Sequence, residues 1–143
     1  AEDLRSIPRL VNRINLEWSM LCSTNCLTAT AFFDALAATA RAHRGCFGSV
    51  DLLVMGVESS LWISEQWGGD VRKAFPGLNV VVASANKVLG SSATTTREVH
   101  FCGFSRITRD DLSRDRPVVL SVSQSGQTFG TLHAVELLLE IVP

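Results

Sequence analysis

Hydroxyl-bearing side chains cluster around one glycine near the end of the chain. Ser123, Ser125 and Thr128 flank Gly126, directly after an apolar run that ends at Val122. Hydroxyl groups are rotatable hydrogen-bond donors. If a helix begins after this segment, its first N–H groups have no partner inside the helix and favour an anion in the loop. The residues therefore indicate either an anion site or an ordinary strand-to-helix turn capped by Ser or Thr.

A strand and a helix are expected on either side of this loop. The apolar, β-branched run 118–122 predicts a strand. After the loop, apolar residues recur at the helical spacings of three and four, and these are Phe129, Leu132, Val135 and Leu139. The order strand, tight loop, helix directs the free N–H groups of the helix towards the loop.

Two earlier polar segments also follow apolar runs. The run 51–57 has the composition of a strand buried on both faces, and Glu58, Ser59 and Ser60 begin the helical pattern after it. A second apolar run, 78–83, ends before Ser84. The order strand, helix, strand predicts a βαβ unit with a right-handed crossover. Ligands of open parallel sheets bind outside the carboxyl ends of the strands, where all three polar segments would lie.

The letters Ser-Gln-Ser-Gly-Gln-Thr at 123–128 resemble the phosphosugar loop of the sugar isomerase (SIS) domain family. The nearest form, in the isomerase half of glutamine:fructose-6-phosphate aminotransferases, has Glu where this chain has Gln127. The resemblance covers roughly residues 50–140, because weaker matches occur at the two earlier strand ends. All three matches follow one another in the order that they have in the family. One of these is Ala83-Ser84, which resembles the Ala-Ser that ends the corresponding strand of the family.

The other match follows the first strand, where the family pattern is Gly-x-Gly-Thr-Ser. Gly56 and Ser60 agree with this pattern, and Ser59 replaces Thr. Glu58 departs from it, because a glycine is usual there. A carboxylate at this position either crowds the loop and repels a phosphate, or points away and caps its own helix.

The resemblance implies a three-layer α/β/α sandwich with a mainly parallel sheet, incomplete at its C-terminal end. It also implies that a hexose or hexosamine 6-phosphate binds the chain as part of a larger isomerase, aminotransferase or sensing protein. The implied ligand-binding residues are Ser123, Gln124, Ser125, Gly126 and Thr128, with Ser59 and Ser60 on the other side. The catalytic residues of the aminotransferases lie outside the matching half, so none is assigned here. The alternative is a non-catalytic SIS-like module that mediates oligomerisation, and Glu58 favours it.

Residues 1–45 form a helical segment that we expect to pack on the α/β domain of residues 46–143. Ser6 and Pro8 suit a helix start, and the apolar positions that follow have helical spacing. These positions are Ile7, Leu10, Val11, Ile14, Trp18 and Leu21. A second helix is predicted over 25–43, and a mobile loop that includes one helical turn is an interpretation of 84–96. Because a truncated sheet leaves an edge uncovered, we expect a homo-oligomer with the N-terminal helices at its interface.

Composition and spacing argue against other classes of function. The net charge of −1 gives no reason to expect nucleic acid as a partner. The longest uncharged stretch, 18–33, is too short and polar for a membrane span. Four cysteines without a C-x-x-C pair fit reduced thiols in the cytoplasm. Three scattered histidines predict no metal site, and neither a dinucleotide-binding nor a P-loop motif occurs, so no cofactor is expected.

Overall fold

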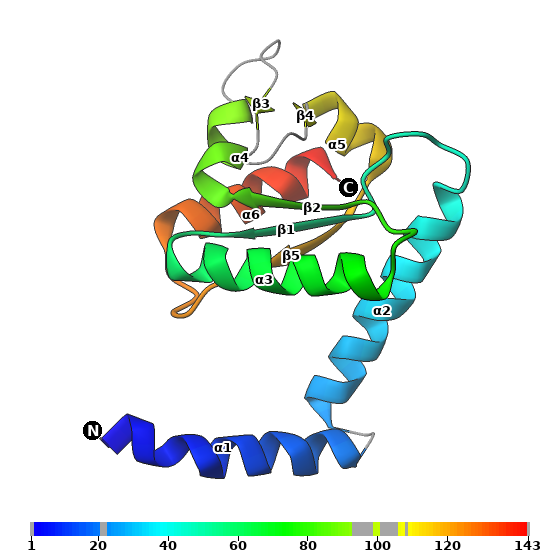
Figure 1. The fold of residues 1–143 in the computed structure, drawn as a ribbon. Helices are drawn as coiled ribbons and strands as arrows, with labels where there is room; N and C mark the ends of the chain where they lie inside the picture. The colour runs from blue at the N-terminus through cyan, green and yellow to red at the C-terminus, as the bar shows by residue number, and fades with distance from the viewer. Residues whose placement is uncertain (1, 21–22, 93–98, 101–105, 108, 143) are drawn as a thin grey trace. The chain divides into compact units, whose positions relative to one another are not determined.

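The computed structural model describes residues 2–20, 23–92, 99–100, 106–107 and 109–142 (Figure 1). The chain divides into two compact units, residues 1–37 and 38–143. The helix α2 (Thr24–Ala42) crosses this boundary, so its last turn belongs to the second unit.

The first unit consists of α1 (Glu2–Ser19) and most of α2. The predicted start of α1 at Ser6 to Pro8 is wrong, because the helix already begins at Glu2 and contains Pro8. Glu17 connects the two helices, accepting hydrogen bonds from Arg13 at 2.7 Å and from Asn25 at 3.0 Å. Most apolar side chains of α1 are about half exposed, among them Ile7, Leu10, Val11, Ile14 and Trp18.

The second unit contains a parallel sheet of β1 (Leu52–Gly56), β2 (Val80–Ser84) and β5 (Val118–Ser121), in the order β2-β1-β5. This confirms the prediction of an α/β fold with a mainly parallel sheet. A second, antiparallel pair is formed by β3 (Val99–His100) and β4 (Arg106–Ile107). All five residues of β1 are buried, as expected of a central strand between two parallel neighbours.

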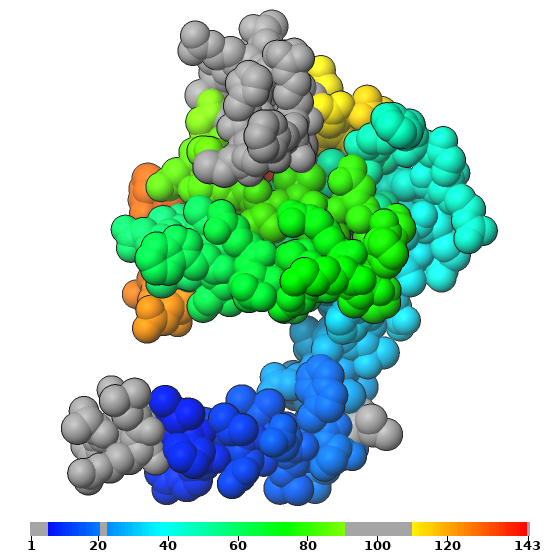
Figure 2. Space-filling view, viewed as in Figure 1, coloured from blue at the N-terminus to red at the C-terminus, as the bar shows by residue number. Residues whose placement is uncertain are grey.

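One face of the sheet packs against α3 (Ser59–Ala74), which lies on the viewer's side of the unit in Figure 2. The large apolar side chains of α3 do not all face the sheet, since Ile63 and Phe75 are 60% and 51% exposed. The buried positions of α3 are instead mostly small, namely Ser60, Ser64, Gly68 and Val71. A Cβ on Gly68 would lie 2.6 Å from Cγ2 of Val82, so α3 can approach the strands closely only with glycine there.

The other face of the sheet packs against α4 (Ala85–Ser92), α5 (Arg109–Asp115) and α6 (Phe129–Ile141). The buried side chains of this cluster include Leu53, Met55, Val81, Val88, Leu112, Ala134 and Leu138. The prediction of a loop over 84–96 is wrong for the first part of this range, where α4 forms. Ala85 and Val88 are almost fully buried, and their burial in the core stabilises this serine-containing helix. Residues 93–96 lie outside the described part of the chain.

Among the described residues, no helix is long and apolar enough to cross a bilayer. Two free cysteines lie in the described part of the chain, Cys26, which is buried, and Cys46, which is exposed.

Candidate ligand site at the carboxyl ends of the parallel strands

The two predicted motif loops follow neighbouring strands of the sheet. Met55 pairs with Ser121 in the parallel register, and the Val122 N–H donates to the Met55 carbonyl at 2.8 Å. From β1 the chain passes through α3 to β2 on one side, whereas β5 lies on the other side of β1 (Figure 1). The carboxyl ends of β1 and β5 therefore form a topological switch point, the usual ligand position in open α/β sheets.

The loop after β5 is held in a turn by its own serines. Ser123 Oγ accepts a hydrogen bond from the Gly126 N–H at 3.0 Å, and Ser125 Oγ accepts one from the Gln127 N–H at 3.1 Å. Gly126 has a φ of +68°, which glycine adopts without steric cost. Since each serine oxygen is used as an acceptor in these bonds, its O–H hydrogen remains free to be donated to a ligand.

Thr128 is the N-cap residue of α6, but its side chain makes no capping hydrogen bond. The sequence allowed two roles for Thr128, binding an anion or capping the helix. The capping hydrogen bond is absent in this structure. Gln124, Ser125 and Thr128 are all exposed, whereas Ser123 is half-buried. Exposed amide and hydroxyl groups thus surround the free N-terminal end of a 13-residue helix.

The turn after β1 is tight and has an unusual backbone. Glu58 has φ 52° and ψ −120°, a conformation that glycine adopts easily and residues with a side chain rarely adopt. A Cβ on Gly56 would lie 2.7 Å from the Ser60 carbonyl carbon, so only glycine fits at that point. The Glu58 side chain is exposed and makes no capping hydrogen bond, although capping was one of its two predicted roles.

The two serines of this turn have different surroundings. Ser59 is exposed in the first turn of α3. Ser60 is only 8% exposed, its N–H donates to the Val57 carbonyl at 3.1 Å, and its own carbonyl accepts from Ser64 Oγ. Ser59 is thus placed to contact a ligand through its hydroxyl, and Ser60 lies beneath the turn that it supports.

Asn86 is a further polar residue at this edge that the sequence analysis did not select. It lies in the first turn of α4, and its Oδ1 occupies the space that a side chain on Gly130 of α6 would need. Cγ2 of Val57 lies 3.6 Å from the same position. The close approach of α4 and α6 places the exposed Asn86 amide beside the start of α6. Its position two residues after a strand end was the signal available in the sequence.

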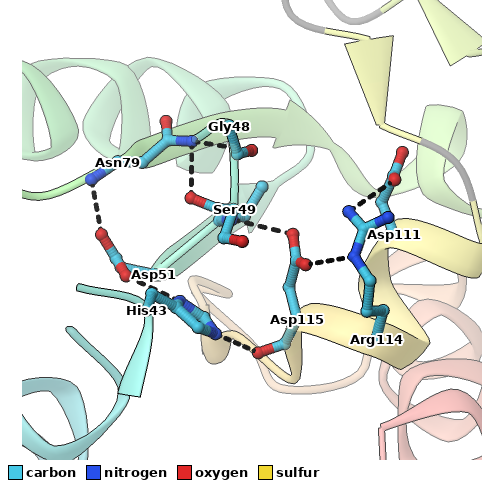
Figure 3. Close-up of polar contacts among 9 residues, drawn as sticks. His43, Gly48, Ser49, Asp51, Asn79, Asp111, Arg114 and Asp115 are labelled. Carbon is cyan, nitrogen blue, oxygen red and sulfur yellow. Dashed lines mark hydrogen bonds and ion pairs between the residues drawn. The ribbon is translucent and has the colours of Figure 1, made fainter. Parts of the chain in front are cut away.

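A second polar cluster lies at the opposite, amino-terminal edge of the sheet (Figure 3). His43 Nδ1 lies 2.8 Å from Asp51 Oδ1, and His43 Nε2 lies 2.7 Å from the Asp115 carbonyl oxygen. Both partners are acceptors, so only the doubly protonated ring can donate to both. In the sequence His43 is one of three scattered histidines, and its spacing does not connect it with these aspartates.

Asp115 joins α5 to the start of β1. Its carboxylate accepts from the Val50 N–H at 2.9 Å and from Arg114 Nε at 2.9 Å, while Arg114 also contacts Asp111 (Figure 3). The hydrogen bond and charge attraction of Asp115, followed by those of Asp111, raise the pKa of Arg114. These contacts are satisfied within the second unit, so the cluster holds His43, the start of β1 and the end of α5 together.

No group of three or more His, Cys, Asp or Glu side chains suited to a metal ion occurs among the residues that the structure describes. Comparison with protein-family models, with curated proteins and with solved structures gave no match to the chain.

Proposed function

We propose that the second unit is a phosphosugar-binding domain of the SIS type, with a three-layer α/β/α sandwich around its parallel sheet. The observation that carries this proposal is the position of the two motif loops. Residues 56–60 and 123–128 follow adjacent parallel strands on the two sides of a topological switch point. The expected ligand is a hexose or hexosamine 6-phosphate, in the cytoplasm and within a larger isomerase, aminotransferase or sensing protein.

The loop after β5 supplies the chemistry for the phosphate. Ser125 and Thr128 have hydroxyl groups that are exposed, and Ser123 has one that can still donate. The Gln124 amide and the backbone around Gly126 complete this side, and Ser59 lies on the β1 side. Glu58 adds a negative charge on the β1 side, and this charge opposes the binding of a phosphate. No catalytic residue is assigned.

A non-catalytic module for assembly is the second candidate function, and β5 supplies the observation that favours it. All four residues of this edge strand are only half-buried, and Leu139 on the adjacent α6 is 71% exposed. Val119, Leu139 and Val142 line an apolar hollow of about 320 Å³ beside the strand. An uncovered strand edge with apolar neighbours is suited to pairing with another chain.

Calorimetric titration with glucose 6-phosphate, glucosamine 6-phosphate and the two unphosphorylated sugars tests the first function. We expect only the phosphorylated sugars to bind. A double variant Ser125→Ala/Thr128→Val should weaken binding at least tenfold, because hydrogen bonds to a charged group contribute about 1.5–3 kcal/mol each. Ser113→Ala, at an exposed position of α5, is the control and should bind as the wild type does. Equal binding of sugars with and without phosphate, or none at millimolar concentration, would contradict the proposal.

A further inference from the structure

A pocket of about 900 Å³ lies at the amino-terminal edge of the sheet, opposite the candidate phosphosugar site. The end of α2, the loop 43–49, the turn after α3 and the starts of β1 and β2 form its walls. All of its lining residues belong to the second unit. Its volume is within the range that holds ligands of nucleotide size.

The floor of this pocket is polar but already satisfied. Asp51 binds the His43 ring through Oδ1, and its Oδ2 accepts from the Asn79 N–H at 2.7 Å (Figure 3). The Asn79 side chain donates to the carbonyls of Gly48 and Ser49, at 3.3 and 2.8 Å. The buried carboxylate is therefore bound within the fold and leaves a rigid floor beneath the opening.

The side chains of two arginines line the same pocket, and neither side chain has an ion pair or hydrogen bond with any described residue. Arg41 is in the last turn of α2, and Arg44 lies three residues further on. An ordinary explanation is that both cations complement the carbonyls at the helix end. Those carbonyls, however, have other donors, because Thr39, Arg41 and His43 each accept from a backbone N–H of residues 43, 44 and 46. The two guanidinium charges are thus available to an anion.

Aromatic side chains lie next to these charges. Phe47 is fully exposed at 107%, and Phe75 is 51% exposed, although both line the pocket. Gly45 and Gly48, with φ of +88° and +86°, bracket Cys46 and Phe47 and present them on a short turn. The faces of exposed phenyl rings are suited to offset stacking with another aromatic ring.

We propose that this pocket binds an anionic ligand with an aromatic ring, of the size of a nucleoside phosphate. Arg41 and Arg44 contact the anionic group, because guanidinium groups bind phosphate through paired hydrogen bonds. Phe47 and Phe75 contact the ring. The binding does not depend on the phosphosugar site, which lies at the other edge of the sheet.

Titration of the full chain with ATP, adenosine and inorganic tripolyphosphate measures the two contributions. We expect ATP to bind more tightly than either of its parts. The variant Arg41→Gln/Arg44→Gln should weaken ATP binding at least tenfold. The variant Arg9→Gln/Arg116→Gln removes the same net charge at exposed positions that do not line the pocket, and should change the affinity less than twofold.

Cys46 gives a second measurement at the pocket itself, because its exposed thiol is one of the lining groups. Mass spectrometry of the peptide that contains Cys46 measures the rate at which this thiol is alkylated. Bound ATP should slow the alkylation, and it should slow it much less in the Arg41/Arg44 double variant. Equal weakening in the two double variants would overturn the proposal, as would unprotected Cys46 or no ATP binding at millimolar concentration. Loss of ATP binding in Ser125→Ala/Thr128→Val would also overturn it, because ATP would then occupy the other edge.

Discussion

Glu58 occupies a backbone conformation that suits glycine, at the point where the SIS pattern has a glycine. A strained residue of this kind costs about 1–3 kcal/mol, and the φ of 52° and ψ of −120° place Glu58 in this class. The side chain is exposed and makes no capping bond that would offset the cost. The sequence identified Glu58 as the departure from the motif, and the structure supplies the physical reason why glycine is the easier residue there.

Replacing Glu58 with Gly should therefore raise the free energy of unfolding by about 1–2 kcal/mol, after the entropic cost of glycine. It should also tighten the binding of glucose 6-phosphate, because a like charge is removed. Chemical denaturation and calorimetric titration measure the two effects. Arg116→Gly is the matched control, since Arg116 also has a positive φ, 48°, but precedes β5 at the opposite edge. The Arg116→Gly variant should leave the affinity for the sugar phosphate unchanged. A Glu58→Gly variant that is less stable than the wild type would contradict the prediction, because the carboxylate would then make a stabilising contact.

At the scale of the elements, α3 shows what periodicity predicts and what it misses. Its bounds and its place in a βαβ unit were predictable, because it lies between two apolar runs and ends before Pro76-Gly77. The buried face was not predictable from hydrophobicity, because Ser64 and Gly68 face the sheet while Trp62 and Ile63 are exposed. Close approach of backbones selects small residues, and hydrophobic spacing does not report this requirement.

Two adjacent glycines of α3 offer a direct test of this packing. Gly68→Ala should lower the free energy of unfolding by about 1–2 kcal/mol, because the new methyl group overlaps Val82 and overpacking outweighs the gain in helix propensity. Gly69→Ala should raise it by about 0.5–1 kcal/mol, because nothing lies within 4 Å of its new Cβ. Urea denaturation of both variants decides the matter. Two stabilised variants would mean that Val82 moves aside without cost.

At the scale of the whole molecule, the apolar side chains of the first unit remain largely exposed. Ile7, Val11 and Ile14 lie on one stripe of α1, and each is about half exposed. We expect the chain to form at least a homodimer in which this stripe contributes to the interface. Analytical ultracentrifugation at micromolar concentration measures the state of association. Ile14→Asp should weaken association at least tenfold, while Asn12→Asp, which adds the same charge to another face of α1, should not. A monomer that unfolds cooperatively would contradict this expectation.

The strands and their carboxyl-end loops were predictable because short apolar runs, turn residues and motif order all indicate the same parallel sheet. The polar cluster of His43, Asp51 and Asp115 could not be predicted, because these residues come from three segments that are far apart in sequence. Sequence spacing describes neighbours on one element. Contacts between the end of α2, the start of β1 and the end of α5 depend on topology.

The central place of β1 has a consequence for how the second unit forms during synthesis. β1 emerges from the ribosome before both of its partners, and β5, which follows β2 along the chain, completes its second edge. Until then a fully apolar strand has an open edge, and pairings between distant strands form slowly. The second edge of β1 therefore remains open to pairing with other strands until β5 has emerged.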